Sequence, residues 1–174
     1  WCHQVASRVQ HLIGADGCVV VRDVPGERRG VAIGQWDGRQ SVVDSWTARY
    51  HGRNPLDQRR HELGARVWTR FGLMPRDAFL RSPYYNEWCR PSGNLDSAGI
   101  SATSAARGGA ESLMLVTSAR TDRFESGGRE ETLLGLLQPA FAAAIGMLAL
   151  ARSWRHALGS ALNLAGSPLA LVQP

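Results

Sequence analysis

The 174-residue sequence contains no lysine, and all 20 of its basic residues are arginine. Without lysine there is no Walker-type phosphate-binding loop, because that motif needs the lysine to reach the phosphates. Uniform use of arginine indicates a coding bias more than a phosphate site. The arginines are scattered, and the densest group is Arg49, Arg53, Arg59 and Arg60. Since nucleic-acid binding needs a basic patch or stripe, we expect this chain not to bind nucleic acid directly.

Cysteine and histidine are sparse, and neither has the spacing of metal ligands. The three cysteines, Cys2, Cys18 and Cys89, form no C-x-x-C pair, and no two of the five histidines stand at ligand spacing. Zinc sites usually draw on closely spaced ligands, so the sequence predicts no metal site. Reduced thiols are typical of cytoplasmic proteins, and we expect a cytoplasmic location.

Familiar catalytic motifs are also missing. There is no G-x-S-x-G nucleophile elbow and no G-x-G-x-x-G loop that leads into a helix. The one pair of adjacent carboxylates, Glu130 and Glu131, opens a predicted helix, where the helix dipole favours negative charge. We therefore predict that the chain is not an enzyme, with no catalytic residues and no cofactor.

The longest apolar segment, residues 133–150, is interrupted by Gln138, Pro139 and two glycines, and Arg152 and Arg155 follow it. It predicts an amphipathic helix, kinked at Pro139, rather than a membrane span. One stripe contains Leu133, Leu137, Phe141, Ile145 and Leu148. Leu134 and Leu136 widen the apolar surface beyond one face, which favours a partner helix. We expect a homodimer through this helix, over Leu133 to Leu150.

Length and composition indicate one folded domain, since 44% of the residues are hydrophobic. Apolar periodicity, β-branched runs and turn residues predict the order of elements. Helices are expected over 1–13, 40–51, two short segments within 74–93, and 126–154; strands over 18–24, 31–36, 66–71, 95–105 and 111–120. The Arg-rich stretch after Pro55 is expected to be irregular. This order indicates an α+β domain with a central antiparallel sheet flanked by helices.

Large aromatic residues are concentrated between the second strand and the short helices. They are Trp36, Trp46, Tyr50, Trp68, Phe79, Tyr84, Tyr85 and Trp88. Tyr and Trp combine an apolar body with a polar tip, as ligand pockets require. Two interpretations stay open: the aromatics fill a core, or they line a ligand site. The second predicts a cavity bounded by Trp36, Trp68, Tyr85 and Trp88.

The stretch RSPYYNEWCRP, residues 81–91, predicts a short helix capped by Ser82, with Pro83 at its first position and its end before Pro91. At 3.6 residues per turn, Tyr84 and Trp88 share one face, while Tyr85 lies about 100° away. We expect Tyr84 and Trp88 to pack inward together, which makes Tyr85 the weaker candidate for a cavity wall.

The segment RSPYYNEWCRPSG resembles a signature of N-terminal sensor domains in certain LuxR-type helix-turn-helix transcriptional regulators. SWTARYHGRNPL and LLQPAFAAAIGM are similar to flanking segments of those domains, with Ala140 where histidine is usual. The resemblance implies a GAF/PAS-like sensory domain over residues 1–158. Residues 159–174 would be a linker or the start of a following PAS-like segment. DNA would be bound only by a helix-turn-helix domain outside this chain, which would then be part of a longer protein.

Three hypotheses follow. In the first, an unidentified small molecule shifts the population of two arrangements of the aromatic helices, and the long helix passes this difference to the DNA-binding domain. In the second, the chain is a dimerisation or scaffolding module without a ligand. In the third, it is a GAF-type reductase that uses Cys2, Cys18 and Cys89.

Overall fold

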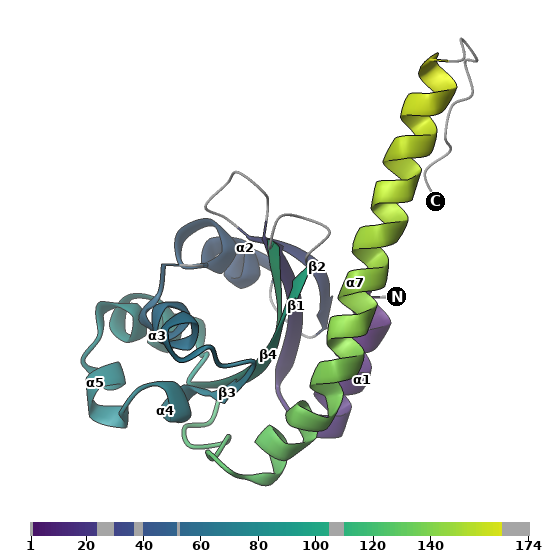
Figure 1. Cartoon of the computed structure of the whole chain (residues 1–174). Helices are drawn as coiled ribbons and strands as arrows, with labels where there is room; N and C mark the ends of the chain where they lie inside the picture. The colour runs from purple at the N-terminus through teal and green to yellow at the C-terminus, as the bar shows by residue number, and fades with distance from the viewer. Residues whose placement is uncertain (1, 24–29, 37–39, 52, 105–109, 165–174) are drawn as a thin grey trace.

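A computed structural model describes residues 2–23, 30–36, 40–51, 53–104 and 110–164. Its centre is a five-stranded antiparallel sheet with strand order β2-β1-β5-β4-β3 (Figure 1). The strands are β1 (Gly17–Asp23), β2 (Gly30–Trp36), β3 (Val67–Thr69), β4 (Asp96–Ser104) and β5 (Ala110–Ser118). The predicted α+β class and antiparallel sheet are confirmed.

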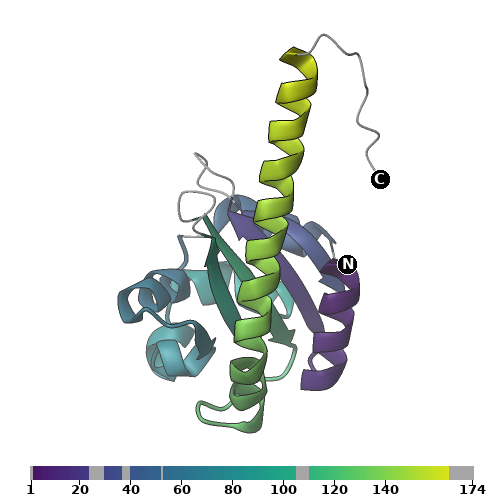
Figure 2. The same ribbon diagram turned by 45° about the vertical axis from the view of Figure 1, so that its right-hand side comes forward.

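Helices cover both faces of the sheet (Figure 2). One face carries α1 (Cys2–Ile13) and α7 (Arg129–Leu164). The other carries α2 (Gln40–Arg49), α3 (Pro55–Leu63), α4 (Arg70–Leu73), α5 (Arg76–Leu80), the π-helical segment η1 (Tyr85–Cys89) and α6 (Arg90–Ser92).

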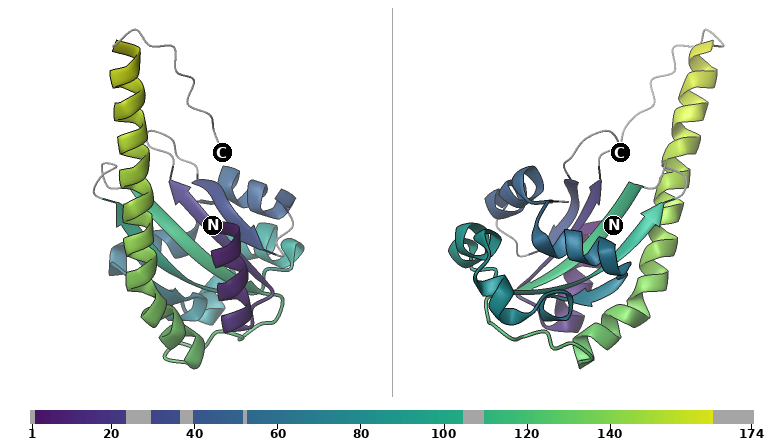
Figure 3. Two further views of the ribbon diagram at one scale, coloured as in Figure 1. Left: turned by 90° about the vertical axis from the view of Figure 1, so that its right-hand side faces the viewer. Right: turned by 60° about the vertical axis from the view of Figure 1, so that its left-hand side comes forward.

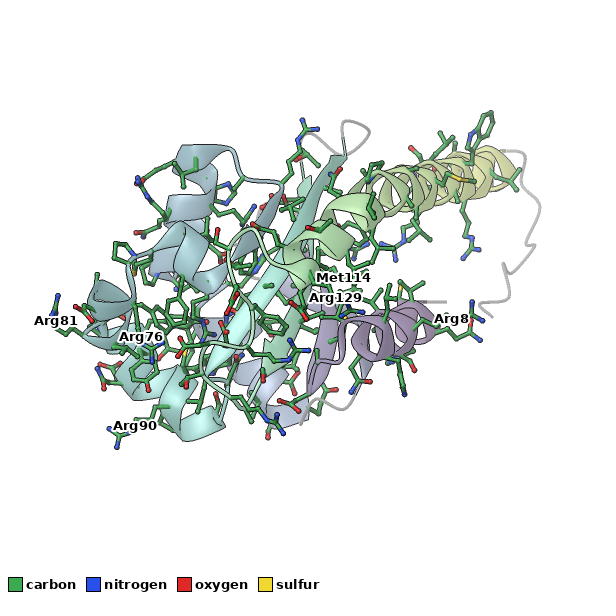
Figure 4. All side chains as sticks on the ribbon, turned by 90° about the horizontal axis from the view of Figure 1, so that it is seen from below. Arg8, Arg76, Arg81, Arg90, Met114 and Arg129 are labelled. Atoms are coloured by element: carbon green, nitrogen blue, oxygen red, sulfur yellow. The ribbon has the colours of Figure 1, made fainter. Side chains whose placement is uncertain are left out.

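Two hydrophobic clusters result, one on each face. Successive side chains of a strand point to opposite faces, so in β5 Met114 and Val116 pack towards α1 and α7, whereas Leu113 packs towards α2 to α6. This explains why β5 is almost continuously apolar. Figure 4 shows Met114 in the interior, while Arg8, Arg81 and Arg90 point outwards.

The Arg-rich stretch after Asn54 is helical, so the expectation of an irregular segment is wrong. The Asn54 side chain accepts hydrogen bonds from the Leu56 and Asp57 amides, both at 3.0 Å. Pro55 occupies the first turn, and Gly64 ends the helix with φ 61°. These are ordinary start and stop signals. Apolar periodicity missed the helix because Leu56 is its main apolar contact with the core.

The helix predicted from Ser82 begins as expected but ends later. Ser82 Oγ accepts the Tyr85 amide at 3.1 Å. The helix then widens into the π-helical segment η1, where the Arg90 amide reaches the Tyr85 carbonyl, and it continues through Pro91 to Gly93. A proline ring clashes with the carbonyl four residues earlier in an α-helix, here that of Glu87. The wider turn gives that carbonyl room, so Pro91 does not stop the helix.

Helix α7 runs from Arg129 to Leu164 and continues through Pro139. Its first turns are inclined to the remainder, and its C-terminal half extends beyond the sheet (Figures 1 and 3). Phe141 and Ile145 are buried against the sheet, and Leu137 packs there too. The predicted stripe therefore lies on the core side of α7, and the predicted homodimer through Leu133 to Leu150 stays a prediction. The predicted domain boundary at 158/159 lies within α7 and stays a prediction.

Among the residues that the structure describes, α7 is also the one helix long and apolar enough to cross a membrane, over Arg129–Ser160. Only its length and apolar composition fit a membrane span, and the core helix of a soluble protein can have the same length and composition.

Candidate functional site: a cavity with an aromatic wall

A partly enclosed cavity of about 230 Å³ lies between the sheet and the helices α2, α3 and α6. Its floor is formed by strands β1, β3, β4 and β5, where β3 contributes Trp68, and its wall by Trp46, Tyr84 and Trp88 from the helices. Its lining includes Trp46, Trp68, Tyr84 and Trp88, the apolar side chains Val42, Val43, Leu56 and Leu115, and the polar residues Asp16, Asn54, Asp57, Ser97, Thr117 and Ser118. The cavity thus combines an apolar body with polar groups at its edges, as small-molecule sites do.

Hydrogen bonds and stacking fix three of the aromatic side chains. The Trp46 Nε1–H donates to Tyr84 Oη at 3.0 Å, and the Trp88 Nε1–H donates to Ser45 Oγ at 3.0 Å. The Tyr84 ring stacks on Trp88, with centroids 5.5 Å apart. Since these three groups satisfy one another or a neighbour, the wall is held by hydrogen bonds and stacking within the chain itself.

Trp68 differs from the other two indoles because its Nε1–H has no hydrogen-bond partner in the described part of the chain, although the side chain is only 3% exposed. Trp68 pairs with Gly99 across β3 and β4. A Cβ added at Gly99 would lie 2.7 Å from Trp68 Cζ2 and 2.6 Å from the Met114 carbonyl oxygen. Glycine at position 99 therefore lets the indole lie close to the sheet. A buried donor without an acceptor costs about 1–3 kcal/mol, and a ligand acceptor would recover that cost.

Two carboxylates supply the acceptors of the cavity edge. Asp16 Oδ2 accepts the Ala119 amide at 2.7 Å and the Ser118 hydroxyl at 2.9 Å. The Ala119 amide is the largest cause that holds the pKa of Asp16 below its usual value, and the Ser118 hydroxyl is the next.

The second carboxylate, Asp57, is buried. Asp57 Oδ2 accepts a hydrogen bond from Asn54 Nδ2–H at 2.6 Å, and Asp57 Oδ1 lies 3.8 Å from Nη2 of the Arg60 guanidinium. The carboxylates of Asp16 and Asp57 are therefore suited to accept hydrogen bonds from donor groups on a ligand.

Among the described residues, the titratable Tyr84 and Cys18 of the lining and the nearby Cys89 are kept protonated by burial. Burial raises the pKa of the Tyr84 hydroxyl well above its ordinary value, so it stays protonated at neutral pH. Burial also raises the pKa of Cys89 to about 11 and that of Cys18 to about 12. Thiols act as nucleophiles in the thiolate form. Burial therefore keeps both thiols in the protonated form at neutral pH.

Four of the eight sequence-predicted residues line the cavity: Trp46, Trp68, Tyr84 and Trp88. The expectation that Tyr84 and Trp88 pack inward together is confirmed, since both are buried in one cluster.

Of the other four, Phe79, Tyr85 and Tyr50 are described by the structure and are not in the lining. Phe79 is fully buried in the core, and Tyr85 packs on it with centroids 5.4 Å apart, so Tyr85 does not bound the cavity. Tyr50 packs against the rings of Tyr84 and Trp88. Trp36 ends β2, and its side chain lies outside the described residues.

Sequence reasoning missed the polar part of the lining. Asn54 and Asp57 carry a local signal, since an Asn-Pro start predicts a helix N-cap, and the N-cap Asn54 holds Asp57. Asp16 and Ser118 are 102 positions apart, and they meet only because β1 pairs with β5. Among the described residues, no group of three or more His, Cys, Asp and Glu side chains could hold a metal ion.

Fold comparisons place this architecture among GAF-like domains. The GAF3 domain of Slr1393 from Synechocystis sp. PCC6803, in its photoproduct state, is 14% identical with a TM-score of 0.58, over 87% of this chain and 94% of that chain. The ligand-binding domain of VqsR from Pseudomonas aeruginosa is 15% identical with a TM-score of 0.55, over 80% of each chain.

A third similar structure is SdiA from Escherichia coli in complex with octanoyl-rac-glycerol. It is 12% identical with a TM-score of 0.56, over 87% of this chain and 60% of that chain. No protein-family model matches the sequence, and no curated protein matches it. At these identities the likeness establishes the fold, which is a GAF-like α+β domain.

Proposed function

We propose that this chain is the small-molecule-sensing domain of a LuxR-type transcriptional regulator and that it binds its ligand in the cavity beside Trp68. The observation that carries the proposal is the buried and unpaired Trp68 Nε1–H in the lining of a preformed aromatic cavity. The likeness of the fold to the VqsR and SdiA domains supports it. So does the RSPYYNEWCRPSG segment, because it forms the helix that carries Tyr84 and Trp88.

The cavity chemistry restricts the ligand. About 230 Å³ is below the roughly 300–1,000 Å³ of drug-sized sites, so the ligand is compact. Its body is apolar or aromatic, to pack on Tyr84 and Trp88. It carries an acceptor for the Trp68 Nε1–H and a donor for Asp16 or Asp57. An anionic ligand is disfavoured because both carboxylates lie in the lining.

Strand β4 offers a route from the ligand to the long helix. Ser97 of β4 lines the cavity on one face of the sheet. On the other face, Ala98 and Ile100 share a hydrophobic cluster with Phe141 and Ile145 of α7. The Gln138 amide also donates to the Ser101 carbonyl at 3.0 Å. A ligand that prefers one position of β4 would therefore favour one position of α7. The DNA-binding domain outside this chain would read that position, in the cytoplasm.

Enzymatic activity is not part of this proposal. The cysteine-dependent reductase is disfavoured because Cys18 and Cys89 are buried on opposite faces of the sheet, in the two separate hydrophobic clusters. Their raised pKa values keep both thiols protonated at neutral pH.

Thermal-shift measurements test the proposal, with octanoyl-rac-glycerol as the first probe and then a library of compact neutral metabolites. A binder should raise the Tm of the wild-type chain. Its affinity should fall about tenfold or more in Trp68→Phe, which keeps an aromatic ring but removes the N–H donor together with the five-membered part of the indole. Trp154→Phe is the matched control, because Trp154 is 69% exposed on α7. If no compound binds and mass spectrometry finds no co-purified molecule, the sensing proposal is wrong.

A further inference from the structure

Helix α7 has a second apolar face, directed away from the domain. The core face contains the buried residues Leu134, Phe141, Ile145 and Ala149. On the other side, every residue of a second row is apolar and exposed. This row, the outer seam, consists of Leu136, Ala140, Ala143, Met147, Leu150, Trp154 and Ala157. A surface helix normally has a polar outer face, so the outer seam needs an explanation.

The spacing of the outer seam is that of a coiled coil. Successive members are four and three residues apart in strict alternation, from Leu136 to Ala157, which makes three consecutive heptads. A repeat of this kind keeps one stripe facing a partner helix. Its length is about 32 Å at 1.5 Å per residue. Its large members are well exposed, from 53% for Leu150 to 74% for Leu136.

The residues that flank the outer seam carry no charge. On one side are Leu137, Ala144, Ala151 and Leu158, and on the other Pro139, Gly146, Ser153 and Ser160. The basic residues Arg152 and Arg155 occupy positions away from the seam. Two copies of this helix therefore meet without like charges at the contact, in either direction. A partner chosen by charge would find no complementary charge here.

We infer that the outer seam binds the same seam of a second copy of this chain. Small side chains at Ala140 and Ala143 permit close approach of the helix axes beside the domain. Towards the C-terminus, Met147, Leu150 and Trp154 provide the contact area. There α7 extends beyond the sheet, so a second helix can lie along it (Figure 2). The inference is independent of ligand binding, because no residue of the outer seam lines the cavity.

Light scattering coupled to size-exclusion chromatography tests the inference on the ligand-free chain. The wild type should have twice the mass of one chain. Met147→Glu/Leu150→Glu should be monomeric with unchanged far-ultraviolet circular dichroism, because both side chains are exposed in the isolated fold. Arg152→Glu/Arg155→Glu, the matched control, places the same acidic residues away from the seam and should stay dimeric.

Three results would overturn the inference. One is a wild type that stays monomeric at the highest soluble concentration, and another is a seam variant that stays dimeric. The third is a monomeric wild type that floats with phosphatidylcholine vesicles through the seam, because a lipid surface would then be the occupant. None of these results bears on the ligand proposal, since the thermal-shift measurement is made on the cavity.

Discussion

The Tyr84 ring stacks on the Trp88 indole, with centroids 5.5 Å apart and planes inclined by only 6°. The two residues are four positions apart on one helix, and both line the cavity. Tyr84 also accepts the Trp46 Nε1–H from α2. The Tyr84–Trp88 pair thus connects the RSPYYNEWCRPSG segment to helix α2. These contacts join the three aromatic side chains into one wall.

Tyr84→Phe should destabilise the fold by about 1–3 kcal/mol, because it leaves the buried Trp46 Nε1–H without its acceptor. Urea denaturation followed by circular dichroism measures the loss. Tyr85→Phe is the matched control, since Tyr85 is half-buried and its hydroxyl is not the acceptor of Trp46. Equal effects of the two substitutions would show that the Trp46–Tyr84 bond contributes nothing measurable.

Gly99→Ala should cost about 1–3 kcal/mol by overpacking, because the new methyl group meets the Met114 carbonyl and the Trp68 indole below 3.0 Å. Gly135→Ala in α7 is the counterpart. An added Cβ meets no atom within 4 Å there, and replacing a helical glycine stabilises by about 1 kcal/mol. Thermal melts of both variants should shift in opposite directions. A Gly99→Ala protein as stable as the wild type would contradict the close approach of Trp68.

Much of the fold follows from local sequence. The β-branched run at β1 and the helical spacing of Tyr84 and Trp88 are signals within a few residues, and both predictions are confirmed. Helix α3 was not predicted because its sequence signal lies in its capping residues and not in a stripe of apolar residues. Tyr85 was predicted to bound the cavity, although its offset of about 100° from Tyr84 made it the weaker candidate, and it packs on Phe79 instead.

The polar half of the site depends on contacts between distant segments. Asp16 meets Ser118 through the pairing of β1 with β5, and Trp68 meets Gly99 through that of β3 with β4. No pattern within a short window encodes such pairs, because strand order is decided by the packing of the whole sheet. The same limit applies to helix α7. The sequence indicates an apolar surface wider than one face, but only the packing of the whole domain determines which side lies against the sheet.

The stabilising contribution of Asp16 should be present at neutral pH and lost in acid. Its folded-state pKa lies below the ordinary value of 3.8, mainly because of the Ala119 amide. The stabilisation is therefore complete above pH 3.8 and is lost as the pH falls through the lower folded-state value. Urea midpoints of wild type and Asp16→Asn should differ most at neutral pH and converge in acid. A difference that grows on acidification would contradict this sign.

Cysteine reactivity should follow burial. At pH 8, Ellman's reagent should modify the half-buried Cys2 well before Cys18 and Cys89, whose pKa values are raised by burial to about 12 and about 11. A Cys2→Ser chain should react only on unfolding. Fast reaction of Cys89 in the folded chain would restore the thiol-enzyme hypothesis.

The most direct measurement follows the indole N–H resonances of the six tryptophans by ¹⁵N–¹H NMR while the best thermal-shift compound is added. The Trp68 resonance should move most, with smaller changes at Trp46 and Trp88, because Trp68 gains a hydrogen-bond partner whereas the Trp46 and Trp88 indoles already have one. Trp154 should stay in place as the internal control. A titration that saturates while the Trp68 resonance does not move would contradict the assignment of this cavity as the ligand site.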